Sequence, residues 1–168
     1  MLRIQEIYQY SSRVRRNFAN KLAEMPWREV EKNREASFHS MKGILVHMIA
    51  NEDWMVNGVI HNKSKEYPRR KPDEFANMKM ILDYLKEVEE RSGHYFEKLN
   101  DGELARGVKL VTSAGQIFDL TVEECLFQSF TEQLYHMGEL IALMWQVNIE
   151  PPRMQWFWNN PRLQTQNA

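Results

Sequence analysis

Apolar residues recur at spacings of three and four in four segments of the chain, a spacing typical of amphipathic helices. Proline residues, which disrupt a helix interior, fall between or after these segments, as at Pro26 and Pro151. The pattern predicts four helices, the second beginning at Ser37 or Phe38: residues 4–25, 37–61, 72–99 and 121–148. Four long helices of this kind predict an all-α fold, a four-helix bundle.

The segment before the last helix has a different pattern. In residues 107–120 two short β-prone runs flank Ser113, Ala114 and Gly115, which predicts a small hairpin. Directly afterwards, Thr121 and Glu124 stand three residues apart at the start of an apolar run. This spacing predicts a capping box, in which each side chain bonds to the other residue's backbone N–H.

The C-terminal segment, residues 151–168, has no helical continuation but contains three aromatic residues, Trp156, Phe157 and Trp158. Aromatic side chains of this size normally pack against another surface, so we expect them to contact this bundle or a second copy of it. With no internal repeat or flexible linker, residues 1–168 are expected to form one domain.

Net charge and cysteine content limit which binding partners and which cellular compartment we expect. The net charge is −1, from 22 basic and 23 acidic residues, so neither nucleic acid nor an anionic membrane is expected as a partner. Cys125 is the single cysteine, which excludes an internal disulfide and favours a reducing compartment. Without an apolar run of signal-peptide or membrane-span type, we expect a cytoplasmic protein.

Two helices carry histidines beside their apolar faces. His47 lies at the edge of the apolar stripe of the second helix, and a lone histidine there is usually a hydrogen-bonded core residue. On the last helix, Glu132 and His136 are one turn apart and share a side. The E-x-x-x-H spacing occurs three times in the chain, but only this pair borders apolar rows.

If both helices turn these groups inward, His47, Glu132 and His136 form a ligand set of two histidines and one carboxylate. Such a set can hold a divalent metal and leave coordination positions open for water or substrate. Candidates for orienting the ligands are four nearby polar residues: Asn51, Glu52, Ser129 and Gln133.

Other functional interpretations are weaker. A ferritin-like di-iron site needs E-x-x-H pairs, and the sequence contains none. Cys125 is more simply a small core residue than a nucleophile, and residues 69–71 are more simply a solvated basic loop. Glu52 and Glu139 are candidates for a general acid or base, although helix glutamates are far more often solvated surface groups.

The order of these elements resembles the DinB/YfiT-like superfamily of metalloenzymes over residues 1–150. Its second helix carries a histidine in a pattern like H-x-x-x-x-E-x-x-W; here His47, Glu52 and Trp54 stand nearby, with the tryptophan one place closer. The family's last helix usually has H-x-x-x-H, which matches His136, but Glu132 replaces the first histidine.

The resemblance implies a metal site at His47, Glu132 and His136 that binds nickel, zinc or a related divalent ion. It also implies a homodimer and a small-molecule substrate, because family members include thiol transferases and thiol-dependent isomerases. We therefore expect a metal-dependent hydrolase or thiol transferase. The alternative is a non-catalytic dimeric binding module in which Glu132 marks a degenerate metal site.

Overall fold

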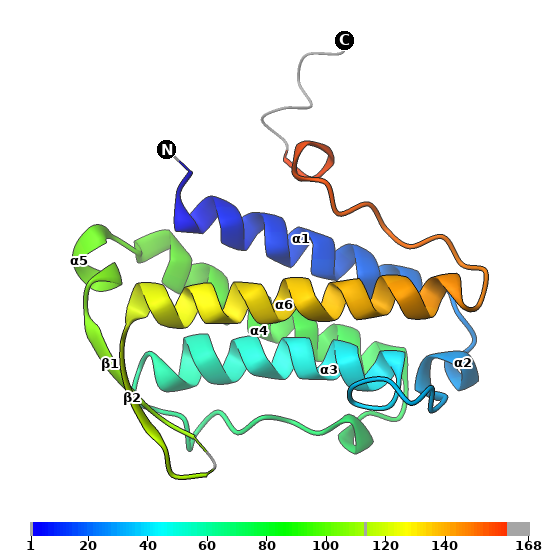
Figure 1. The fold of residues 1–168 in the computed structure, drawn as a ribbon, viewed down its shortest axis with the longest axis horizontal. Helices are drawn as coiled ribbons and strands as arrows, with labels where there is room; N and C mark the ends of the chain where they lie inside the picture. Colours follow the sequence, from blue (N-terminus) through cyan, green and yellow to red (C-terminus); the bar gives the residue numbers. More distant parts are fainter. Residues whose placement is uncertain (1, 113, 161–168) are drawn as a thin grey trace.

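The computed structural model describes residues 2–112 and 114–160, and four long helices lie side by side in it (Figure 1). They are α1 (Ile4–Ala23), α3 (Met41–Glu52), α4 (Met78–Lys98) and α6 (Val122–Trp145). The shorter elements are α2 (Trp27–Glu31), α5 (Asp101–Leu104), strands β1 (Gly107–Val111) and β2 (Ile117–Thr121), and helical turns at Asp53–Val59, Pro72–Glu74 and Trp156–Trp158. The predicted four-helix bundle with a hairpin before its last helix is confirmed.

The second long helix begins later than predicted. Ser40 is the N-cap of α3, and its hydroxyl accepts a hydrogen bond from the Gly43 N–H at 3.0 Å. Phe38 and His39 instead have left-handed φ angles of 52° and 64°, so they belong to a turn. A Cβ on Gly43 would lie 2.0 Å from the Phe38 carbonyl oxygen, so only glycine lets this turn approach the helix.

Beyond Glu52 the second helix continues as a π-helix, Asp53–Val59, which carries Trp54. Stretches of π-helix are rare and frequently lie at functional sites. The third helix also begins later than expected, because Asn77 caps α4 while Pro72 opens only a 3-10 turn. Proline at the first position suits either kind of helix, so its presence did not distinguish them.

The hairpin and the last helix are joined as predicted. Strand β1 pairs with β2 in antiparallel register from Gly107 opposite Thr121 to Val111 opposite Ile117, while Ser113 lies outside the described residues. At the start of α6, the Glu124 N–H donates to the Thr121 hydroxyl and the Thr121 N–H donates to the Glu124 carboxylate. The predicted capping box is therefore confirmed. The helix ends at Trp145, three residues before the predicted boundary.

The aromatic C-terminal segment runs back along α1 (Figure 1). Trp156 packs on Tyr10 with ring centres 5.1 Å apart, and the Tyr10 hydroxyl donates to the Met154 carbonyl. This part of the segment therefore contacts its own bundle. Phe157 and Trp158 remain 56% and 50% exposed.

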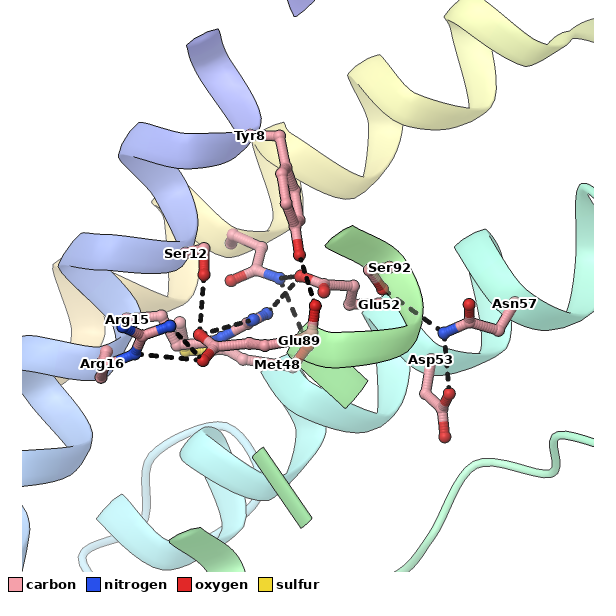
Figure 2. A network of polar contacts seen from close by, with 11 residues as sticks. Tyr8, Ser12, Arg15, Arg16, Met48, Glu52, Asp53, Asn57, Glu89 and Ser92 are labelled. Atoms are coloured by element: carbon pink, nitrogen blue, oxygen red, sulfur yellow. Dashed lines mark hydrogen bonds and ion pairs between the residues drawn. The ribbon is translucent and has the colours of Figure 1, made fainter. Parts of the chain in front are cut away.

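Two apolar clusters form the core, and a polar layer separates them on α3, α4 and α6. The fully buried Arg15 of α1 donates to Glu52 of α3 and to Glu89 of α4 (Figure 2). Gln133 of α6 also donates to Glu52, at 3.2 Å. This layer ties all four long helices together. Within the described residues, no helix has the length and apolar character to cross a membrane.

Candidate metal centre

The three predicted ligands meet between α3 and α6. The Glu132 Oε2 atom lies 3.9 Å from His47 Nε2 and 3.4 Å from His136 Nε2. The imidazole rings stand edge to face with their centres 4.7 Å apart. One donor atom from each residue lies within 4.8 Å of the other two, so sequence positions 85 or more residues apart are brought into one cluster.

His136 is oriented by a carboxylate on its other side. Its Nδ1 lies 2.6 Å from Glu139 Oε2, the same oxygen that accepts a hydrogen bond from the Ser37 hydroxyl. Burial raises the pKa of Glu139, but the hydrogen bonds from Ser37 and His136 outweigh it and lower the pKa. An ionised Glu139 only accepts, so Nδ1 of His136 donates to it, and Nε2 is the ring nitrogen on the side of Glu132.

His47 is held in its neutral form. Burial lowers its pKa to about 4, and the neighbouring His136 and Arg69 act in the same direction while Glu139 opposes them. The Phe38 ring stacks on the His47 ring at 3.9 Å between centres. Phe38 therefore covers one face of the imidazole, and the turn that displaced the predicted helix start contributes directly to the site.

Glu132 completes the cluster from a more open position. Its side chain is 38% exposed, and its Oε1 accepts a hydrogen bond from Gln128 at 3.0 Å. The other oxygen, Oε2, is the one that faces both imidazoles. The two carboxylate oxygens of Glu132 thus have different surroundings. One accepts a hydrogen bond from Gln128 of the same helix, and the other is directed at the two histidines.

The donor set fits a divalent ion. Ligands bound at about 2.0–2.2 Å in a tetrahedral site lie about 3.4 Å from one another, close to the two measured separations from Glu132. Two imidazole nitrogens and one carboxylate oxygen are ligands that divalent transition metals accept. A carboxylate behind a histidine ligand, as Glu139 lies behind His136, is a recurrent feature of such sites.

The sequence-based choice of ligand-orienting residues was wrong for Glu52 and Gln133. Glu52 binds Arg15, and Gln133 donates to Glu52. Asn51 accepts from Arg69 instead, and Ser129 is buried on α6. The residue that orients His136 is Glu139, which the sequence marked only as a weak candidate for acid–base chemistry.

Cys125 lies away from this cluster and is fully buried on α6. Burial raises the pKa of its thiol, which keeps it protonated at neutral pH. Its surroundings agree with the interpretation of Cys125 as a small core residue.

A cavity of about 890 Å³ opens beside His47 and Glu132. The hairpin contributes Leu110, Phe118 and Leu120 to the cavity lining, and the π-helix contributes Trp54. Arg69, which the sequence placed in a solvated loop, instead belongs to the cavity wall. A cavity of this size suits a small molecule and is mostly apolar, as ligand sites are.

Comparison with known proteins identifies the family. The sequence matches the model of the DinB family over residues 1–165. The chain belongs to the DinB family. The resemblance noted in the sequence is therefore confirmed, and the departure at Glu132 is a feature of this DinB-family chain rather than a sign of another fold.

A solved structure supports the DinB-family architecture. The crystal structure of a DinB-like protein from Bacillus cereus ATCC 10987 aligns with a TM-score of 0.61 at 16% identity, covering 87% of this chain and 91% of that one. At 16% identity, the similarity shows a shared fold alone. No curated protein matches the sequence.

Proposed function

We propose that this DinB-family protein is an enzyme that binds one divalent metal ion through His47, Glu132 and His136. The observation that carries the proposal is the hydrogen bond between His136 Nδ1 and Glu139, which leaves His136 Nε2 facing Glu132 beside a neutral His47. Zinc and nickel are the ions that this donor set favours.

The chemistry proposed is hydrolysis or thiol transfer on a small molecule. A divalent ion at this position supplies a Lewis acid that lowers the pKa of a bound water or thiol. His47 and His136 would each offer one ring nitrogen to the ion, while Glu132 and Glu139 would offset its positive charge. Phe38 shields the His47 ring from water on one face, and the cavity next to Glu132 gives a substrate access.

Elemental analysis of untagged protein, purified without added metal and again after incubation with zinc or nickel, tests this proposal. We expect about one divalent ion per chain and its loss in the His47→Ala and Glu132→Ala variants. His94→Ala is the matched control, because His94 also follows a glutamate by four residues but lies exposed on α4. Protein without metal under both conditions, or metal retained in both site variants, would overturn the proposal.

A second candidate function is a non-catalytic interaction module. The observation in its favour is a row of exposed apolar side chains on α6: Phe127, Leu134, Tyr135 and Trp145. Exposed apolar surface of this kind is typical of protein–protein contacts. Absence of bound metal together with self-association would favour this function over the enzyme.

A further inference from the structure

Arg69 presents a cationic group to the cavity without an acidic partner. Its guanidinium carbon lies 3.8 Å above the centre of the Trp54 ring, and one nitrogen donates to Asn51 Oδ1 at 3.1 Å. Among the described residues, no carboxylate forms an ion pair with Arg69, although Glu132 acts on it electrostatically. Stacking on tryptophan fixes the guanidinium plane and leaves its other N–H groups available to a ligand.

Asn51 adds a second unused donor in the same wall. The residue is 4% exposed and lies one helical turn beyond His47 on α3. Because Arg69 can only donate, Asn51 must direct its amide oxygen toward Arg69. Its buried Nδ2 has no hydrogen-bond partner in the described structure, which is costly unless a bound group accepts from it.

Two glutamates restrict the charge that this cavity accepts. Glu132 faces the histidines, and Glu124 is held by the capping box of α6. Both lie in the cavity wall, so in the metal-free protein a dianion at Arg69 would have one positive partner and two negative neighbours. A single negative charge is compensated by Arg69, and the apolar hairpin wall suits an apolar body attached to it.

We propose that Arg69 and Asn51 bind the carboxylate of an amphipathic monocarboxylic acid whose apolar part lies along Leu110, Phe118 and Leu120. The carboxylate accepts from the guanidinium and from the Asn51 amide, satisfying both unused donors. This assignment deepens the proposed function. It rests on that proposal only in taking the cavity beside the three metal ligands as the substrate site. It names the substrate class as a carboxylic acid with an apolar chain or ring.

The test uses 4-phenylbutyrate as the probe and neutral 4-phenylbutyramide as its matched analogue. Binding to the metal-free protein is measured by ligand-observed NMR titration, and the indole N–H signal of Trp54 reports where the probe lies. We expect the acid to bind at least about tenfold more tightly than the amide. Arg69→Gln should remove that preference, and Arg69→Lys, which keeps the charge but not the planar fork, should retain part of it.

Lys71→Gln is the control, because it removes the same charge two residues away, outside the cavity lining. Equal binding of acid and amide, or an unchanged acid preference in Arg69→Gln, would overturn the assignment. Tighter binding of phenyl phosphate than of 4-phenylbutyrate would overturn the monocarboxylate class. If the native chain binds no metal but still prefers the acid over the amide, this inference holds while the metal proposal fails. The two failures are therefore distinguishable.

Discussion

Two groups of polar side chains, the polar layer and the candidate metal centre, lie on neighbouring turns of α3 and α6. They differ in the residues with which they pair. In the polar layer, Arg15 and Arg16 pair with Glu52 and Glu89, so the charges are matched within the bundle (Figure 2). In the candidate metal centre, two imidazoles and a carboxylate face one another, and among the described residues no Lys or Arg forms an ion pair with Glu132. The charges of the first group are paired within the fold, whereas the second group presents a donor set that a bound cation would fill.

The difference shows how a polar group inside a helix bundle can be assigned to structure or to binding. Glu52 follows His47 by five residues, yet it is buried against Arg15 and contributes nothing to the cavity. Glu132 is the neighbour of Gln133, yet its carboxylate is partly exposed at the cavity. Whether a carboxylate pairs with an arginine inside the bundle or lines the cavity therefore separates the two roles better than position in sequence.

The largest expected effect is on the polar layer. Replacing Arg15 with Met leaves Glu52 buried without its cation, which should lower the free energy of unfolding by about 3–5 kcal/mol. Urea denaturation of the variant and the native chain measures the loss. The double variant Arg15→Met, Glu52→Met removes both charges and should recover much of it. A single variant as stable as the native chain would contradict the structural role of the layer.

The helices and the capping box could be predicted because their signals are local. Apolar spacing indicates which face is buried, and both halves of the Thr121–Glu124 box lie within one turn. The start of α3 was misplaced because Phe38, an apolar residue in helical register, instead covers His47 from a left-handed turn. That turn depends on the close approach at Gly43, a tertiary contact.

The site was only partly predictable for a similar reason. The meeting of His47, Glu132 and His136 followed from their places on two helix faces and from the family resemblance. Glu139, three residues beyond His136, had the right spacing, but the same spacing occurs on solvated helix surfaces. Arg69 had no local signal at all, because its position is fixed by stacking on Trp54 in another element.

The second effect is a pH dependence that the polar layer should not share. The pKa of His47 falls from 6.5 to about 4 on folding, so between these values the unfolded chain binds more protons. Stability of metal-free protein should therefore decline by about 3 kcal/mol as pH falls from 6.5 to 4. Well above pH 6.5 His47 is neutral in both states and should make no contribution to the slope.

Since carboxylates also titrate in this range, the measurement is the difference between the native chain and His47→Gln. Thermal unfolding in the presence of a chelator, repeated across the pH range, gives this difference. Parallel curves for the two proteins would show that His47 is not held neutral by the fold.

The third effect is on metal affinity through Glu139. Glu139→Gln keeps the shape of the side chain but removes the charge that orients His136 Nδ1–H. We expect a 10- to 100-fold weaker zinc affinity, about 1.4–2.7 kcal/mol, measured by competition with a coloured chelator. Glu97→Gln is the control, because Glu97 lies beside the exposed His94. Unchanged affinity in Glu139→Gln would mean that the charge of Glu139 is not needed to orient the imidazole of His136.

The smallest effect on the free energy of unfolding is expected when an exposed apolar side chain of α6 is replaced. The homodimer that the family resemblance implies remains a prediction, and Leu134, exposed on the helix that carries Glu132, gives it a test. Leu134→Lys should change the unfolding free energy by only about 0.5 kcal/mol but convert a dimer to monomer in sedimentation equilibrium. Met80→Lys, an apolar-to-charged change on α4, should leave the dimer intact.

The Leu134→Lys variant also tests whether the candidate metal centre, like the polar layer, is formed within one chain. All three candidate ligands belong to one chain, as do the partners of the polar layer. Leu134→Lys should therefore bind zinc with unchanged stoichiometry even as a monomer. If monomer formation abolished metal binding while the bundle stayed folded, the candidate centre would need a group from a second copy, and the polar layer alone would be complete within one chain.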